Sequence, residues 1–292
     1  MSTDQENRLE PSGCSFAQLD QPPIFVIGAA RSGTTWVSNI LASPYQVAGI
    51  HESWLFTKNA GLANLFGEQH RAGLNNGLSV ILSDQDLIRY TREFSMKIMS
   101  HALQPHHRFL VEKSPSHAWS IELLNRLYPE SKFIHVLRDG RDVAVSVLAA
   151  SKSWAPAWKN SMGSSVAMSA RNWQTLIQRV KRTSDLLDDR FLEVRYEEIR
   201  AHPFEYYQKL FDFCGIPWDD EMLKQVHDDT NFEHNYRPKE NGFRRGGRVG
   251  DWRSRFSIWD AWRFDCHAGN TLLDLGYAEP NWWCRLPFRS YR

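Results

Sequence analysis

Short apolar runs alternate along this chain with longer stretches in which apolar residues recur at helical spacing. The apolar runs predict buried strands at residues 24–27, 46–50, 108–111, 132–137 and 191–196. The periodic stretches predict a helix that ends near residue 150 and further helices at 34–41, 84–103, 116–128, 163–188, 203–214, 219–226 and 257–275. Strands that alternate with helices are typical of an α/β protein. We therefore expect a three-layer fold, with helices on both faces of a central parallel sheet of about five strands.

Three stretches do not follow this alternation. Residues 1–21 are polar and predict a flexible N-terminal tail, which leaves residues 22–292 as a single domain. Residues 55–80 carry glycine and asparagine with weak periodicity, and we expect a variable segment that resembles a lid. Residues 230–257 are rich in arginine and glycine, which favours an irregular structure.

Residues able to do chemistry follow the predicted strands directly. In chain order, Arg31, Glu52, Lys113, Arg138 and Tyr196 come after the first to the fifth strand. Parallel sheets of this class bind their ligands at the carboxyl ends of the strands. We therefore expect these side chains to meet in one site.

The loop after the first strand has the composition of an anion site. Gly28 and Gly33 let the backbone approach an anion closely, and the start of the following helix offers N–H groups and a positive dipole end. Hydroxyl donors are added by Ser32, Thr34 and Thr35. The glycine spacing is that of the triphosphate-binding loop G-x-x-x-x-G-K-[ST], but Thr34 occupies the lysine position and the cation is Arg31. The loop predicts a phosphate site that is not built for a triphosphate.

Composition narrows the function classes. A net charge of +1 gives no field that favours nucleic acid. The four cysteines lack metal-ligand spacing, so we expect reduced thiols and no metal. We also expect no signal peptide and no membrane span, because no apolar run is long enough, and a cytoplasmic location is the default.

Four segments together resemble the motifs of the sulfotransferase family. Residues 28–36 (GAARSGTTW) are similar to its 5′-phosphosulfate loop, and residues 133–146 to its 3′-phosphate motif, in which an arginine precedes a serine by eight residues. Residues 195–199 (RYEEI) resemble its Y-E-x-[LI] segment, and residues 245–252 (RGGRVGDW) its R-K-G-x-x-G-D-W motif. The resemblance covers residues 23 to 275, with the motifs in the family's order.

The resemblance implies a donor and the residues that bind it. The donor is 3′-phosphoadenosine 5′-phosphosulfate (PAPS), the product is 3′-phosphoadenosine 5′-phosphate (PAP), and no metal is required. Arg138 and Ser146 would bind the 3′-phosphate, separately from the anion site of the first loop. Trp36 and Tyr196 would flank the adenine, or would only fill the core. The implied donor-binding residues are Arg31, Ser32, Gly33, Thr34, Thr35, Trp36, Arg138, Ser146, Tyr196, Arg245 and Gly247.

Departures from the common pattern bring the chain close to the branch that sulfates tyrosine in proteins or carbohydrates. Arg31 stands where many cytosolic members have lysine, and Pro115 stands at the position of their catalytic histidine. Glu52 matches the glutamate base of the tyrosylprotein enzymes. The resemblance therefore implies sulfuryl transfer to a hydroxyl or amine, with Glu52 as general base and Lys113 and Arg31 as its catalytic partners.

Other interpretations stay open. His51 or His117 would replace Glu52 as base, and Arg244 or Arg248 would replace a lysine that the last motif lacks. Asp139 ends an apolar strand as a magnesium-binding aspartate does, which makes an ATP-dependent small-molecule kinase the alternative function. An inactive nucleotide-binding homologue is a third. The acceptor stays open among a small molecule, a carbohydrate and a peptide, although the glutamate base favours a carbohydrate, a peptide tyrosine or another hydroxylated metabolite over a drug-like phenol. A homodimer is compatible with the sequence.

Overall fold

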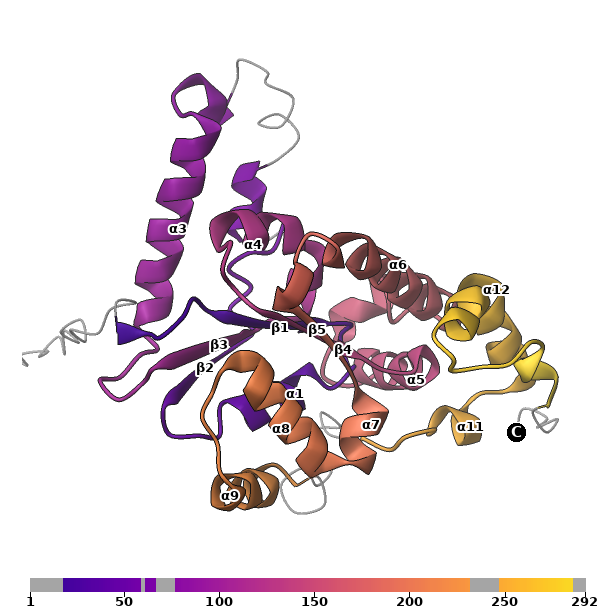
Figure 1. Cartoon of the computed structure of the whole chain (residues 1–292). Helices are drawn as coiled ribbons and strands as arrows, with labels where there is room; N and C mark the ends of the chain where they lie inside the picture. The colour runs from indigo at the N-terminus through magenta and orange to yellow at the C-terminus, as the bar shows by residue number, and fades with distance from the viewer. Residues whose placement is uncertain (1–17, 59–60, 67–76, 232–246, 286–292) are drawn as a thin grey trace, which may run out of the picture.

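The computed structural model describes residues 18–58, 61–66, 77–231 and 247–285, and a parallel sheet lies at its centre (Figure 1). The sheet has five strands in the order β2-β3-β1-β4-β5. These strands are β1 (Ile24–Gly28), β2 (Val47–His51), β3 (Phe109–Lys113), β4 (Phe133–Leu137) and β5 (Phe191–Arg195). Phe25 in the central strand is in register with Glu112 of β3 and Phe133 of β4. The expected α/β fold and its five strands are confirmed.

Both faces of the sheet are apolar, because successive residues of a strand point to opposite faces. Phe25 and Ile27 belong to a core with residues of α4, α5, α6 and α12, whereas Ile24 and Val26 belong to a second core with residues of α1, α8 and α9. Figure 1 shows α4 and α6 on one side of the sheet and α1, α8 and α9 on the other. The bounds are α1 (Thr34–Leu41), α4 (Ile121–Leu127), α5 (Gly140–Ser151), α6 (Val166–Ser184), α8 (Pro203–Cys214), α9 (Asp220–Thr230) and α12 (Ile258–Asp274).

Side-chain caps fix several helix starts. The Ser83 hydroxyl accepts the Asp86 N–H at the start of α3 (Asp84–Ser100), and the Ser165 hydroxyl does the same for Met168 in α6. At α12, Ser257 and Asp260 form a reciprocal capping box. Such caps satisfy N–H groups that have no partner inside the helix, which is why these starts fall close to where the sequence predicts them.

Three predicted elements differ in the structure. The helix expected at 116–128 is two pieces, η4 (Pro115–Trp119) and α4, because η4 closes on Ser120 with φ −123° and ψ 18°, outside the helical range. Tyr196 does not extend the fifth strand but begins α7 (Tyr196–Ala201). The run 230–257, expected to be irregular, contains the short helix α11 (Trp252–Arg255).

The remaining short elements are 3₁₀ helices. They are η2 (Leu62–Phe66), η3 (Gly77–Val80), η5 (Pro156–Asn160), η6 (Asp188–Arg190) and η7 (Trp282–Arg285). Two of these lie in the segment 55–80, for which the sequence predicts a lid. Residues 59–60 and 67–76 of that segment, and residues 1–17 of the predicted tail, fall outside the described residues.

Candidate active site

A cavity of about 440 Å³ opens at the carboxyl ends of the strands, where the sequence predicts the site. Arg31, Glu52, Arg138, Ser146 and Tyr196 all line it. They come from segments that follow β1, β2, β4 and β5, so the parallel topology brings them together. The other lining residues are Ala30, Gly33, Thr34, Thr35, Trp36, Trp54, Pro115, Ser116, Asp142, Trp154, Trp158, Met162, Gly247, Arg248 and Asp251.

The loop between β1 and α1 forms one wall of the cavity. Gly33 is the N-cap of α1 with φ 104°, and Arg31 is held at φ 73°, a region that L-residues rarely adopt. The Ser32 hydroxyl is buried and has no hydrogen-bond partner among the described residues. A strained loop and an unsatisfied donor at a helix start fit a bound anion, because such strain is found where a ligand is held.

Gly33 gives a direct test of how tightly this loop is packed. A Cβ there would lie 2.5 Å from Cδ2 of Tyr196, and φ 104° already disfavours any side chain. We expect Gly33→Ala to lower the free energy of unfolding by about 3 kcal/mol or more, from backbone strain and a ring that must move. Urea unfolding at constant pH measures this loss in the free energy of unfolding.

Gly276→Ala is the matched control for that substitution. Gly276 also has a positive φ, 71°, but a Cβ there meets nothing within 4 Å. Gly276→Ala should lower the free energy of unfolding only through backbone strain, by about 1–2 kcal/mol. Equal losses in the two variants would show that Tyr196 does not constrain the loop.

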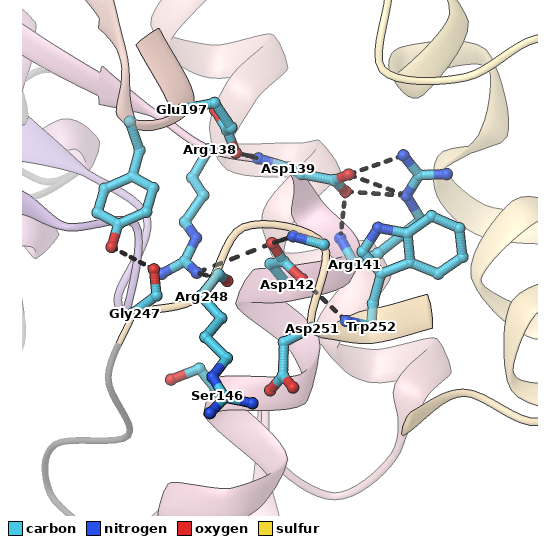
Figure 2. Close-up of polar contacts among 12 residues, drawn as sticks. Arg138, Asp139, Arg141, Asp142, Ser146, Glu197, Gly247, Arg248, Asp251 and Trp252 are labelled. Atoms are coloured by element: carbon cyan, nitrogen blue, oxygen red, sulfur yellow. Dashed lines mark hydrogen bonds and ion pairs between the residues drawn. The ribbon is translucent and has the colours of Figure 1, made fainter. Parts of the chain in front are cut away.

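Arg138 lies at the centre of the second predicted anion-binding region (Figure 2). Its Nη1 donates to the Arg31 carbonyl at 3.3 Å, its Nη2 donates to the Arg248 carbonyl at 3.0 Å, and its guanidinium stacks 4.2 Å from the Tyr196 ring centroid. The Tyr196 hydroxyl donates to the Gly247 carbonyl at 2.6 Å. Arg138 Nε is buried and has no hydrogen-bond partner within the described part of the chain, so one donor of the fork is left for a ligand oxygen.

The two predicted anion regions are in contact in this structure. Arg31 Nε donates to the Ser146 hydroxyl at 3.1 Å, and Arg138 reaches back to the Arg31 carbonyl. This contact forms because the loop after β1 and the start of α5 follow adjacent strands.

Asp142 organises the loop that closes this region. Its carboxylate accepts the N–H of Gly250 at 2.7 Å and the N–H of Trp252 at 2.9 Å, whereas its distance to Arg138 Nη2 is 3.8 Å. Burial raises the pKa of Asp142, against the charge of Arg138 and these two N–H bonds. Figure 2 shows the Arg248 side chain running from this loop toward Ser146. Arg248 lines the cavity, and its replacement of the missing lysine stays a prediction.

The Asp139 carboxylate is paired with another arginine, Arg141. Its Oδ1 accepts from Arg141 Nε at 2.9 Å and its Oδ2 from Arg141 Nη2 at 2.7 Å. The Arg141 guanidinium itself lies against two rings, 3.9 Å from the centroid of Trp252 and 4.5 Å from that of Trp282. Both carboxylate oxygens of Asp139 are therefore committed to the fold, which argues against the magnesium-binding interpretation.

Glu52 and Lys113 form an ion pair at the ends of β2 and β3. Lys113 Nζ donates to Glu52 Oε1 at 2.8 Å. The Lys113 side chain is 2% exposed, whereas that of Glu52 is 48% exposed and lines the cavity. Lys113 contacts Oε1, which leaves Oε2 as the oxygen that can accept a proton.

A buried network holds the segment that carries Glu52. Glu112, fully buried in β3, accepts the hydroxyls of Ser53 and Ser114 at 2.7 Å and His117 Nδ1–H at 2.8 Å. His117 Nε2 in turn accepts the Phe56 N–H at 3.2 Å. Glu52 itself has φ 55° and Trp54 has φ 54°. The network therefore fixes a strained turn between β2 and the cavity, a role that no local pattern reveals.

We expect this network to contribute stability that depends on pH. Burial works to raise the pKa of Glu112, but His117 and the hydrogen bonds from His117, Ser114 and Ser53 outweigh it, so the pKa is below its ordinary value. A carboxyl whose folded pKa is lowered contributes stability above its unfolded pKa, and this is lost as pH falls through the folded pKa. The urea concentration at the unfolding midpoint, measured from pH 7 to pH 3, should therefore decrease toward pH 3.

Glu112→Gln isolates this contribution. An amide in that place turns a donor toward either His117 or a serine hydroxyl, and we expect a loss of about 1–3 kcal/mol at pH 7 with a weaker acid dependence. Glu122→Gln is the control, because Glu122 makes a surface pair with Arg179, and such pairs contribute about 0–1 kcal/mol. An unchanged acid dependence in Glu112→Gln would contradict the assignment.

The remaining predicted residues divide between cavity and core. Trp36 and Tyr196 are both buried in the second core and stack edge to face at 5.6 Å, and the Trp36 indole N–H donates to the Thr230 carbonyl. Both nevertheless line the cavity. His117 is buried with both ring nitrogens engaged, so it is unsuited to act as the base. Arg244 and Arg245 fall outside the described residues.

His51 is the remaining histidine near the site. Burial and the neighbouring Lys113 lower its pKa, against the carboxylates of Glu52 and Glu112. It does not line the cavity. Within the described ranges, no three His, Cys, Asp or Glu side chains are placed to hold a metal ion. No helix in the described part of the chain is both long and apolar enough to span a bilayer.

Comparison with known proteins follows the same motifs. The model of the sulfotransferase family matches residues 22–220. Protein-tyrosine sulfotransferase 1 of Danio rerio is 25% identical over 204 residues, which is 70% of this chain and 56% of that protein. Protein-tyrosine sulfotransferase 2 of Gallus gallus is 25% identical over 205 residues, or 70% of this chain and 54% of that protein. The chain thus spans about half the length of these curated relatives.

Solved structures share the fold at low identity. Sulfotransferase STF9 from Mycobacterium avium is 16% identical with a TM-score of 0.53, covering 87% of this chain and 76% of that one. Mouse sulfotransferase SULT7A1, solved in a complex with PAP, is 16% identical with a TM-score of 0.52, covering 88% and 89%. These likenesses show the fold that the strand order also gives.

Proposed function

The chain belongs to the sulfotransferase family, and we propose that it transfers a sulfuryl group from PAPS to a hydroxyl or amine of an acceptor. The observation that carries this proposal is the convergence on one cavity of Arg31, Arg138 and Ser146 with the carboxylate of Glu52. Cations and hydroxyls suit a doubly anionic donor, and a carboxylate beside them suits proton removal from an acceptor.

The residues present fit the donor. The unsatisfied Ser32 hydroxyl and Arg138 Nε are buried at the two anion-binding regions, and Arg31 contacts Ser146 between them. Ser32, the amides at the start of α1 and Arg31 would hold the 5′-phosphosulfate, and Arg138, Ser146 and Arg248 the 3′-phosphate. Tyr196 and Trp36 would border the adenine. A structural neighbour was solved with PAP, which supports this choice of donor.

The reaction needs little from the protein beyond position and charge. The donor supplies a sulfuryl group already activated by its link to phosphate. Glu52 Oε2 takes the proton of the acceptor hydroxyl as the acceptor oxygen bonds to sulfur. Lys113 does not line the cavity itself but pairs with Glu52 at 2.8 Å, and its proposed role is to offset negative charge on the leaving oxygen. Glu52 lines the cavity from a backbone with φ 55°, which the surrounding hydrogen bonds hold in place.

Two alternatives have weaker support. A kinase would need a magnesium ligand after β4, but Arg141 occupies both oxygens of Asp139. An inactive homologue would have no reason to keep the Glu52–Lys113 pair beside the cavity.

Calorimetry with PAP, AMP and ATP tests the donor. We expect PAP to bind at least tenfold more tightly than AMP or ATP, because only PAP has the 3′-phosphate that Arg138 and Ser146 would bind. Adding magnesium should not raise the affinity for ATP relative to the affinity for PAP. Comparable affinities for PAP and ATP would overturn the proposal.

A further inference from the structure

Glu112 and His117 are two ionisable groups beside the site that the proposed reaction does not use. Both side chains are fully buried, and neither lines the cavity. His117 Nδ1 donates to Glu112 Oε2 at 2.8 Å. Burying a carboxylate and an imidazole costs free energy that an apolar pair of similar volume does not cost. A role beyond packing is therefore to be sought in the segment that this pair holds.

The segment that it holds follows Glu52 directly, and we call residues 53–56 the anchored turn. The Ser53 hydroxyl donates to Glu112 Oε1 at 2.7 Å, and the same hydroxyl accepts the Leu55 N–H at 3.2 Å. The first bond uses the proton of the hydroxyl and the second uses a lone pair. One serine side chain therefore joins the buried carboxylate to the backbone of the turn.

The other two residues of the anchored turn are held by the remaining partners of Glu112. The Trp54 N–H donates to the Ser114 hydroxyl at 3.4 Å, and the Phe56 N–H donates to His117 Nε2 at 3.2 Å. Because Nε2 accepts a hydrogen bond, the proton of the His117 ring lies on Nδ1, from which it is donated to Glu112. All four residues of the turn are thus tied to one buried carboxylate, with at most one side chain between them.

The anchored turn sets the direction of two groups at the cavity. Glu52 has φ 55° and Trp54 has φ 54°, and both line the cavity. β2 ends at His51, and after the bond from the Glu52 N–H to the Lys113 carbonyl the chain leaves the sheet. A left-handed backbone at residues other than glycine persists where the surrounding contacts impose it. Here those contacts come from Glu112 and its partners.

We propose that Glu112 and His117 are positioning residues for sulfuryl transfer. They hold the anchored turn so that the Glu52 carboxylate and the Trp54 ring face the acceptor, and they touch neither the donor nor the acceptor themselves. This inference rests on the proposed sulfotransferase function and goes beyond it, because it assigns part of the turnover rate to a buried pair outside the cavity. A purely structural pair would change stability and leave the turnover of the folded molecule unchanged.

Variants of His117 in the full chain test the assignment by rescue. His117→Gln can keep both hydrogen bonds, since its amide oxygen can accept the Phe56 N–H and its NH₂ group can donate to Glu112, whereas His117→Leu removes both. Turnover is measured with saturating PAPS and with water or 4-nitrophenol as the probe acceptor. It should fall about 10²-fold in His117→Leu, because a small displacement of a catalytic group has an effect of that size. His117→Gln should stay within about threefold of the unmodified chain.

Ser53→Ala tests the same effect with a smaller change to the fold, because the Glu112–His117 pair stays in place. We expect turnover to fall about tenfold, and hydrogen exchange at the amides of residues 54–56 to become faster. Ser95→Ala is the matched control, because the Ser95 hydroxyl also bonds a buried side chain, Tyr128 at 2.6 Å, but lies outside the cavity lining. Neither turnover nor exchange in the anchored turn should change in that control.

Calorimetry with PAP separates this inference from the proposed function. PAP affinity should stay within about twofold in all four variants, since the anchored turn carries neither Arg138 nor Ser146. If the unmodified chain does not bind PAP, the donor is overturned, and exchange in Ser53→Ala still tests the turn. Unchanged exchange or unchanged turnover in Ser53→Ala would overturn the inference. So would an equal loss of turnover in His117→Gln and His117→Leu, or in Ser53→Ala and Ser95→Ala.

Discussion

Replacing Glu52 with glutamine is expected to lower kcat by about 10²–10⁴-fold, because the amide cannot take the acceptor proton. PAP affinity should stay within about twofold of the unmodified protein, since Glu52 follows β2, whereas Arg138 and Ser146 follow β4 on the other side of β1. Glutamine is chosen over alanine because its amide oxygen can still accept from Lys113 Nζ, which is buried and now 2.8 Å from a carboxylate oxygen. Initial rates with saturating PAPS and calorimetry with PAP measure the two quantities.

Two further variants sharpen this result. His51→Gln removes the histidine next to Glu52 in sequence, and it should leave kcat within about threefold because His51 does not line the cavity. Glu93→Gln, at an exposed position of α3, controls for the loss of one carboxylate. A rate that falls in His51→Gln and persists in Glu52→Gln would move the base to the histidine. A loss of PAP affinity in Glu52→Gln would show that this carboxylate supports donor binding instead.

Much of the site could be predicted because strand ends are visible in sequence. The five apolar runs are short and bounded by polar residues, so each end marks where a side chain reaches the sheet edge. In a parallel sheet all five ends meet at one edge, and Arg31, Glu52 and Arg138 accordingly share a cavity. The family motifs added the expected roles, and those roles stay predictions until the experiments are done.

The parts that sequence missed depend on contacts between distant segments. Glu112 looks like one residue of a charged strand end, and only its burial against Ser53 and His117 shows that it fixes the turn after Glu52. Asp142 lies four residues after Arg138 in the sequence, whereas in the structure it chiefly accepts two backbone N–H groups from a loop more than 100 residues later in the chain. Neither role leaves a periodic or local signal, because the donors are backbone groups and hydroxyls common everywhere in proteins.

Contact between the first loop and α5 was missed for the same reason. Sequence motifs place Arg31 and Ser146 in different binding regions, but their side chains meet at 3.1 Å. The order β1-β4 in the sheet explains it, because parallel neighbours bring the loops after them together. Sequence order alone does not give that adjacency.

Arg138→Lys is expected to remove most of the preference for PAP over AMP. Lysine keeps the positive charge but cannot make the planar fork by which Arg138 reaches the carbonyls of Arg31 and Arg248 and stacks on Tyr196. Each charge-assisted hydrogen bond to a phosphate is worth about 1.5–3 kcal/mol, and about 1.4 kcal/mol is tenfold in affinity. We therefore expect PAP to bind about 10²-fold more weakly, with a smaller change for AMP, when both are measured by calorimetry.

Arg141→Lys separates this effect from general damage to the fold. Arg141 is also a buried arginine at the start of α5, paired with Asp139 and packed against two tryptophan rings, but it does not line the cavity. Its replacement should lower the urea midpoint and keep the ratio of PAP to AMP affinity. If both variants lose that ratio equally, the discrimination comes from the packing of the region. If Arg138→Lys retains the ratio of PAP to AMP affinity, the 3′-phosphate is bound elsewhere, and the assignment of Arg138 to the 3′-phosphate fails.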